Sequence, residues 1–93
     1  MSADEPDLAP VTVRYWASVR AAAGRAQDTV PAGTLSQVIA SVRKVHEADQ
    51  RFASVVSICA VLVGSEPVGT RDPDQVVVAP GDTVELLPPF AGG

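Results

Sequence analysis

Residues 80–93 read Pro80-Gly81-Asp82-Thr83-Val84-Glu85-Leu86-Leu87-Pro88-Pro89-Phe90-Ala91-Gly92-Gly93. Pro-Gly-Asp is a tight-turn sequence. The alternation that follows puts Val84 and Leu86 on one face and Thr83, Glu85 and Leu87 on the other, which predicts a strand over residues 83–87. The two prolines restrict the backbone to an extended exit. This stretch therefore predicts a last strand that leads directly into an extended tail.

The chemistry of that tail rests on its terminal carboxylate. From Leu86 onward there is no His, Cys, Ser or acidic side chain. A free α-carboxyl group has a pKa of about 3.3–3.7, so it is an anion at neutral pH and a poor electrophile. It becomes reactive when another enzyme converts it into an acyl-adenylate. Gly93 is thus the expected reactive residue, and Gly92, which has no side chain, gives a partner close access to it. The alternative is an inert terminus that happens to end in glycines.

The N-terminal part predicts two strands and a short helix. Residues 11–17 are rich in β-formers and alternate apolar and polar side chains over their first five positions, which predicts a strand with Val11, Val13 and Tyr15 toward the core. Residues 18–23 predict one helical turn capped by Gly24. Residues 27–31 predict a short second strand.

The middle of the chain predicts the main helix. Thr34 and Gln37 form a capping-box pattern. The apolar residues that follow have the spacing of one buried helical stripe, namely Leu35, Val38, Ile39, Val42 and Val45. Phe52, Val55 and Val56 predict a further helical turn on the same core. Residues 57–63 form an apolar run that predicts a strand buried on both faces.

A short return at Val68 and a brief extended piece at residues 76–78 complete the order of elements. If the last strand lies parallel to the first, the chain forms an α+β fold with a mixed sheet of four or five strands and one main helix across it. That architecture is a ubiquitin-like β-grasp. The expected organisation is a disordered acidic leader over residues 1–10, a domain over residues 11–89 and a flexible tail over residues 90–93.

Composition narrows the class of protein. The 93 residues favour one domain, and 46% hydrophobic with 4% aromatic residues predict an aliphatic core. Seven basic and eleven acidic residues give a net charge of −4, which argues against nucleic-acid binding. The single cysteine, Cys59, cannot form an intramolecular disulfide. No apolar stretch predicts a membrane span and no signal pattern is visible, so we expect a cytoplasmic protein.

Two segments give the sequence a family resemblance: residues 11–20, and residues 80–93 with their Gly-Asp turn, Pro-Pro and terminal Gly-Gly. The chain resembles the MoaD family, the small subunits of molybdopterin synthase, among the ThiS/MoaD-like ubiquitin-like sulfur carriers. The resemblance covers about residues 11–93. Leu86-Leu87 stands where members of the family often have aromatic residues, which puts partner affinity or choice in question.

The resemblance implies a function. An ATP-dependent enzyme adenylates the terminal glycine, here Gly93, and sulfuration makes a thiocarboxylate. The tail then enters the active site of a larger catalytic subunit and donates sulfur to a pterin precursor of the molybdenum cofactor. This chain would bind no cofactor itself, since ATP is used by the activating enzyme. It would be a non-catalytic, sulfur-donating subunit of a synthase.

Residues flanking the tail are the candidates for partner binding. Leu87, Pro88, Pro89, Phe90 and Ala91 lead to the terminus, and Leu87 and Phe90 are expected to form a docking patch. Trp16 either joins that patch or packs under a loop.

The remaining candidates have simpler interpretations. Four residues are candidates for interface charges: Arg14, Arg20, Asp82 and Glu85. Asp82 is explained by its place in the turn, and the other three are most simply solvated charges. Cys59 is expected to be a core residue and His46 a helix-end cation or surface residue. No metal site is expected, because no second His or Cys lies at ligand spacing.

Other functions remain open. The same fold serves sulfur carriers for thiamine, cysteine or tRNA thiolation. A ubiquitin-like protein modifier would join Gly93 to lysines of its targets. A plain interaction module would have an inert terminus.

Overall fold

The computed structural model describes residues 9–89. The predicted tail and nearly all of the predicted leader lie outside this range. The assignment of a leader, a domain and a tail therefore stays a prediction.

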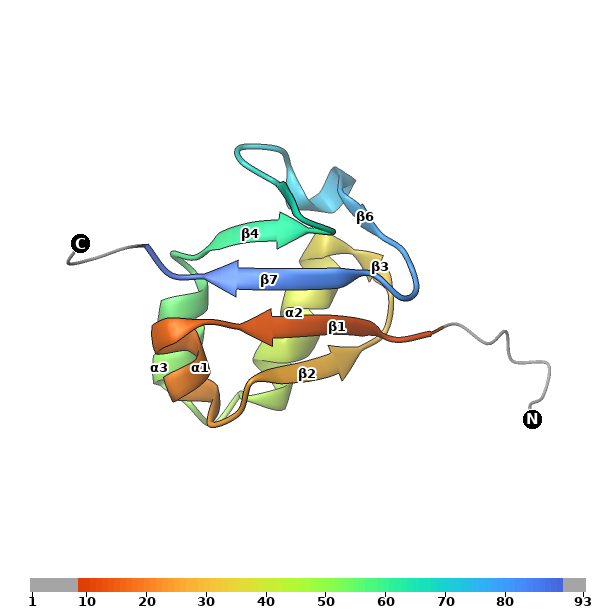
Figure 1. Cartoon of the computed structure of the whole chain (residues 1–93). Helices are drawn as coiled ribbons and strands as arrows, with labels where there is room; N and C mark the ends of the chain where they lie inside the picture. The colour runs from red at the N-terminus through yellow and green to blue at the C-terminus, as the bar shows by residue number, and fades with distance from the viewer. Residues whose placement is uncertain (1–8, 90–93) are drawn as a thin grey trace, which may run out of the picture.

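A five-stranded mixed sheet forms the frame of the molecule (Figure 1). Its strands are β1 (Val11–Tyr15), β2 (Gln27–Val30), β4 (Ala60–Val63), β5 (Glu66–Pro67) and β7 (Thr83–Leu87). They lie in the order β2-β1-β7-β4-β5. Strand β7 is parallel to β1, and the other neighbouring strands are antiparallel. The last strand thus lies at the centre of the sheet beside the first, as the sequence predicts.

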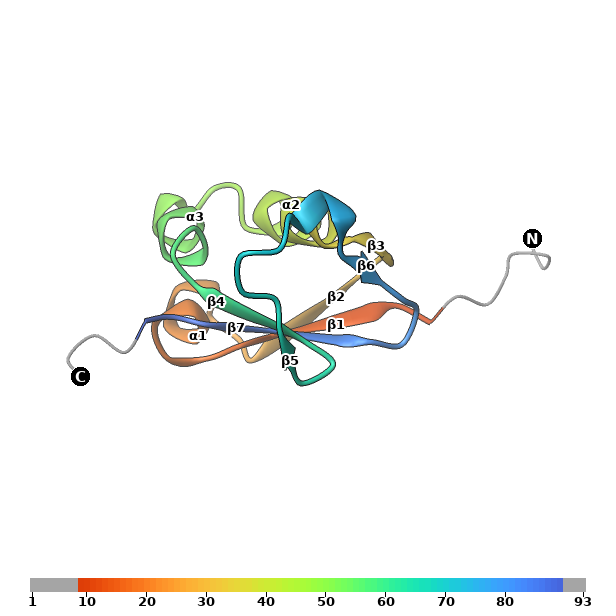
Figure 2. The same cartoon turned by 90° about the horizontal axis from the view of Figure 1, so that it is seen from above.

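Three α-helices accompany the sheet: α1 (Ala17–Ala23), α2 (Leu35–Val45) and α3 (Gln50–Val56). Figure 2 shows α2 and α3 on one side of the sheet. The predicted capping box begins α2, since the Gln37 amide donates to Thr34 Oγ1 at 3.2 Å and the Thr34 amide donates to Gln37 Oε1 at 2.9 Å. Helix α1 ends at Gly24, whose φ of 78° is left-handed. None of the helices in residues 9–89 is long and apolar enough to cross a membrane.

The core fills the space between the sheet and the helices. Each fully buried Val, Leu or Phe side chain contributes about 1.5–3 kcal/mol relative to its exposed state. The sheet supplies the inward residues of the two central strands, and the helices supply the stripe that faces them. The side chains with at most 2% exposure are Val11, Val13, Tyr15, Val19, Leu35, Val38, Val42, Phe52, Val78, Val84 and Leu86.

The predicted strand over residues 57–63 is wrong in its start and in its burial. Helix α3 continues to Val56, and β4 begins only at Ala60. Ile58 is 61% exposed, because it lies in the turn between the two elements. The residues of β4 are exposed or half-buried, since only one face of the sheet is covered by helices. The apolar run reflects that partial burial together with a turn.

The return strand also differs from its prediction at Val68. Residues Glu66–Pro67 form β5, and Val68 is a buried residue just after it. A second, two-stranded sheet pairs β3 (Gly33–Thr34) with β6 (Val77–Val78), beside the short 3-10 helix η2 (Pro73–Gln75). The sequence gives no indication of β3, because two residues show no periodicity.

A polar cluster links β1, β2 and the end of α2. Asp28 Oδ2 accepts hydrogen bonds from Tyr15 Oη and from His46 Nε2, both at 2.7 Å, and Asp28 Oδ1 accepts from Arg25 Nε at 2.9 Å. Since an ionised carboxylate can only accept, His46 donates through Nε2. The His46 ring stacks on Phe52 with ring centroids 4.2 Å apart. His46 ends α2 as predicted, but with 9% side-chain exposure it is a packed structural residue, so its interpretation as a surface residue is wrong.

The cluster has a defined protonation state. Burial alone would raise the pKa of Asp28, but the hydrogen bonds from Tyr15 and His46 and the attraction of Arg25 outweigh it and hold that pKa below its usual value. Burial and the neighbouring Asp28 carboxylate raise the pKa of the Tyr15 hydroxyl far above its ordinary range. Tyr15 therefore stays a donor and Asp28 stays an acceptor at neutral pH.

Candidate functional site

The base of the tail is the carboxyl end of the central strand β7. Strand β1 holds one side of it, where the Trp16 amide donates to the Leu86 carbonyl at 3.2 Å. Strand β4 holds the other side, where Ala60 pairs with Leu87. Pro88 is half-buried and Pro89 is exposed. Because β7 has a strand on each side, the point where the tail leaves the body is held on both sides.

Four of the predicted site residues lie beyond Pro89: Phe90, Ala91, Gly92 and Gly93 fall outside the described residues. The predicted roles of the tail and of its terminal carboxylate therefore stay predictions. The described residues do fix where the tail begins and which surface surrounds it.

That surface is the face of the sheet turned away from α2 and α3, which we call the outer face. It carries the side chains that alternate with the core residues in the three inner strands. The strand register places Arg14 of β1 beside Glu85 of β7, and Glu85 beside Leu62 of β4. Leu87 lies two residues further along β7 toward the tail, on the same face and opposite Ala60. Leu62, Glu85 and Leu87 are half-buried.

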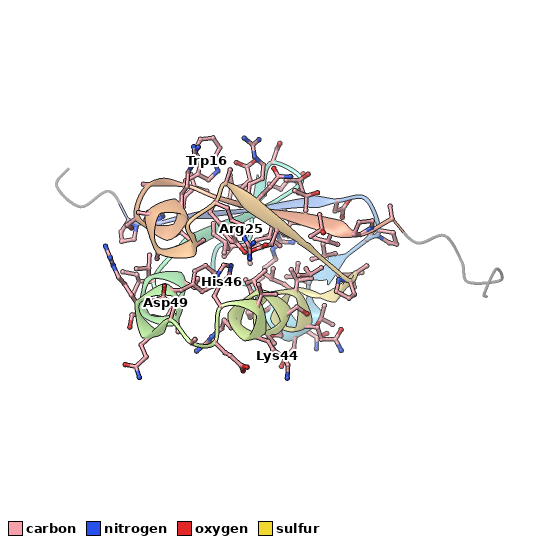
Figure 3. The ribbon with its side chains drawn as sticks, turned by 90° about the horizontal axis from the view of Figure 1, so that it is seen from below. Trp16, Arg25, Lys44, His46 and Asp49 are labelled. Carbon is pink, nitrogen blue, oxygen red and sulfur yellow. The ribbon has the colours of Figure 1, made fainter. Side chains whose placement is uncertain are left out.

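Trp16 belongs to this outer face. Its indole Nε1 donates to Glu85 Oε1 at 3.0 Å, and the Arg14 guanidinium lies 5.0 Å from the centre of the indole ring. Figure 3 shows Trp16 on the side of the molecule opposite Lys44 of α2. Trp16 is 38% exposed on this face, while Phe90 of the predicted docking patch lies outside the described residues, so the place of Trp16 in that patch stays a prediction. The next residue, Ala17, has a φ of 48°, a left-handed conformation that lets the chain turn sharply into α1.

Leu87, Pro88 and Pro89 follow one another at the base of the tail, and Trp16 lies beside that base through the bond of its amide to the Leu86 carbonyl. Sequence reasoning missed Leu62 and Ala60, because the register of β4 against β7 shows no sign in the local pattern. It also missed that Glu85 serves as the acceptor for Trp16. That contact joins residues 69 positions apart.

Cys59 shows none of the features of a sulfur-transfer residue. Its thiol donates to the Val55 carbonyl at 3.2 Å. Burial raises its pKa to about 11. A reactive cysteine needs the opposite shift, which makes the thiolate available at neutral pH. The structure thus gives Cys59 the packing role that the sequence predicts.

No metal-binding cluster is present within residues 9–89: nowhere in this range do three His, Cys, Asp or Glu side chains gather as candidate ligands. A surface groove of about 550 Å³ runs along α2 between Ile39, Lys44 and Pro73, on the side of the molecule opposite the outer face. The surface at the base of the tail is instead a sheet face that carries both apolar and charged side chains, among them Leu62, Leu87 and Glu85.

The sequence of the chain matches the model of a known protein family. The model of the ThiS family matches residues 13–93. The chain belongs to the ThiS family. The match runs from the first strand to the terminal glycines, so it includes both strands that hold the tail base.

Individual relatives of this ThiS-family chain agree with that assignment. The molybdopterin synthase sulfur carrier subunit of Aspergillus niger is 28% identical over 82 residues, which are 87% of this chain and 91% of the relative.

Solved structures with the same fold include the small archaeal modifier protein 1 of Methanosarcina acetivorans, with a TM-score of 0.75 and 19% identity over 91% of this chain and 97% of the other. The complex of subunits 1 and 2 of the molybdopterin-converting factor of Helicobacter pylori gives a TM-score of 0.62 and 20% identity over 90% and 99%. The fold is therefore the ubiquitin-like β-grasp expected from the order of elements.

Proposed function

We propose that this chain is the sulfur-carrier small subunit of a molybdopterin synthase, acting in the cytoplasm. The observation that carries the proposal is the family match that extends to Gly93, the expected reactive residue. The curated relative from Aspergillus niger, a molybdopterin synthase sulfur carrier subunit, supports the choice of pathway. The resolved complex of the two Helicobacter pylori subunits supports a larger subunit as the partner.

The reaction begins at the terminal carboxylate. An oxygen of Gly93 attacks the α-phosphorus of ATP on an activating enzyme, and pyrophosphate leaves. A sulfur nucleophile then attacks the acyl carbon of the mixed anhydride and AMP leaves, which gives a thiocarboxylate. Its sulfur is a softer and more nucleophilic atom than oxygen, and it attacks a pterin precursor on the large subunit. Water then cleaves the bond between that sulfur and the acyl carbon of Gly93, which returns the terminal carboxylate and leaves the sulfur on the precursor.

The body of the protein contributes position and recognition. Strands β1 and β4 hold the base of the tail, so the large subunit receives the terminus from a defined point. Trp16, Leu87, Pro88 and Pro89 supply apolar area around that point, which with Phe90 and Ala91 forms the proposed docking surface. The acid and base groups of the reaction then belong to the large subunit, and ATP is bound by the activating enzyme.

The test is the intact mass of the chain after incubation with ATP, a sulfur source and the activating enzyme. We expect the replacement of one oxygen by sulfur, followed by loss of that sulfur when the large subunit and the pterin precursor are added. The control is a chain extended by one alanine after Gly93, whose fold is unchanged and whose terminus cannot be delivered. If the extended chain still supports cofactor synthesis, the proposal is wrong.

The same assay separates the alternatives. A carrier for thiamine, cysteine or tRNA thiolation would gain sulfur and keep it in the presence of the large subunit. A protein modifier would give higher-mass adducts with other proteins in the lysate. An inert terminus would give neither product.

A further inference from the structure

Arg14 has no partner of opposite charge within residues 9–89, although the register of the sheet offers one. It lies beside Glu85 in the parallel pairing of β1 with β7. Neighbouring opposite charges on one face of a sheet ordinarily attract each other. Here Glu85 Oε1 accepts from the Trp16 indole instead, at 3.0 Å. Within that range no acceptor lies within hydrogen-bond or ion-pair distance of the Arg14 guanidinium, which rests over the indole at 5.0 Å from its centre.

This arrangement contrasts with two other arginines of the chain. Arg25 pairs with Asp28 at 2.9 Å, and Arg71 donates to the carbonyls of Pro67 and Val68. Both of those side chains serve the fold. Arg14 instead lies on the exposed outer face, and none of the five N–H donors of its guanidinium has an acceptor within residues 9–89.

The Arg14 guanidinium carbon lies 5.0 Å from the centre of the indole ring, within the range of a cation–π contact. A guanidinium is planar, and its N–H groups lie at its edge. That edge matches a carboxylate, which accepts two parallel hydrogen bonds from it. A partner that covered Arg14 with apolar or basic groups would strip water from the donors and return nothing, so such a partner is rejected.

We propose that Arg14 selects the partner: the large subunit of the synthase presents a carboxylate to Arg14 at the edge of the apolar surface that it lays over Trp16, Leu62 and Leu87. Trp16 contributes to this selection in two ways. Its indole N–H donates to Glu85, which keeps Glu85 from pairing with Arg14, and its ring makes a cation–π contact with the Arg14 guanidinium. The inference rests on the proposed function and adds the chemistry of the partner's surface to it.

The experiment measures the dissociation constant of the full chain with the large subunit of the same organism, by calorimetry at low and moderate salt. Arg14→Gln is expected to weaken binding by about tenfold or more and to reduce the salt dependence. Arg14→Lys keeps the positive charge but loses the planar guanidinium that can donate two parallel hydrogen bonds. Its dissociation constant should therefore lie between those of the unmodified chain and of Arg14→Gln. Arg43→Gln is the matched control and should leave the affinity unchanged, because Arg43 is an exposed residue of α2, the helix that covers the opposite side of the sheet (Figure 2).

A double-mutant cycle tests the part played by Trp16. Trp16→Phe keeps a ring and removes the N–H, which frees Glu85 to pair with Arg14. In that background Arg14→Gln should cost less than about threefold, because Arg14 is already occupied. Equal costs of Arg14→Gln in both backgrounds would show that Trp16 does not control Arg14, and would overturn its role.

Gain of sulfur at Gly93, measured by intact mass in every variant, keeps the two proposals apart. If Arg14→Gln gains sulfur and binds the large subunit as tightly as the unmodified chain, the selection by Arg14 is refuted and the proposed function stands. If the unmodified chain gains no sulfur and does not bind the large subunit, the proposed function fails and the inference fails with it.

Discussion

Asp28→Asn should lower the stability of the domain by about 2–3 kcal/mol. The substitution keeps the shape of the side chain, but asparagine has one acceptor oxygen and its amide donates, so donors from Tyr15, His46 and Arg25 cannot all be satisfied. A hydrogen bond to a charged group contributes about 1.5–3 kcal/mol and a neutral one about 0.5–1.5. Weakening the two bonds to Tyr15 and His46 therefore costs about 2 kcal/mol. Arg25, which is 53% exposed, adds at most about 1 kcal/mol.

The effect should depend on pH in a direction set by the Asp28 carboxyl. Its pKa is lowered in the folded state, so the folded protein favours the ionised form. The stability that this provides is complete above the unfolded pKa of about 3.9 and is lost as the pH falls through the folded value. The difference between the unmodified protein and the variant should thus be full near neutral pH and should narrow below about pH 4.

Urea denaturation followed by circular dichroism, at a series of pH values from neutral to about 3, measures this difference. Near neutral pH the melting temperature should also fall by about 10–20 °C for a domain of this size. Arg25→Gln is the control, because it removes only the exposed pair and should cost less than about 1 kcal/mol. A loss below about 0.5 kcal/mol for Asp28→Asn, or a loss that stays the same in acid, would refute the reasoning.

Three further predictions follow from local geometry. Gly24→Ala should lower stability by about 1 kcal/mol, because Gly24 has a φ of 78° and a β-carbon there would meet no atom within 4 Å, so only backbone strain acts; an unchanged urea midpoint would contradict this. Thr34→Ala should cost about 1 kcal/mol by removing the cap on α2, while Thr34→Ser should keep most of it, and equal midpoints for both variants would disprove the role of the cap. With a pKa of about 11, Cys59 should react with iodoacetamide at neutral pH about two to three orders of magnitude more slowly than a free cysteine, and labelling at the free rate would show that its burial is wrong.

Local signals in the sequence account for most of the elements. The alternation of residues 83–87 predicts β7 with the bounds that the structure has, because a half-buried strand must alternate. Thr34 and Gln37 predict the start of α2, since both partners of the capping box lie within one turn. The parallel placement of β1 beside β7 is compatible with the right-handed rule for crossover connections, but that rule alone does not decide which strands become neighbours.

Contacts between distant residues could not be predicted in the same way. The partner of Glu85 is Trp16 rather than Arg14, and that choice depends on side-chain directions at the start of α1. His46 meets Asp28 only because α2 ends over β2, a matter of helix length and tilt. Residues 57–63 misled the strand prediction because an apolar run looks the same in a turn, in a helix end and in a strand.

The parallel pairing of β1 with β7 makes direct neighbours of the first and the last strands that the ribosome synthesises. Thr12 pairs with Thr83, so the centre of the sheet forms only after β7 has been synthesised. A translation product that stops short of residue 83 leaves β1 and β4 without the strand between them, and it stays open to proteolysis. Under the proposed function, a copy that ends before residue 83 therefore lacks both the closed sheet and the reactive terminus.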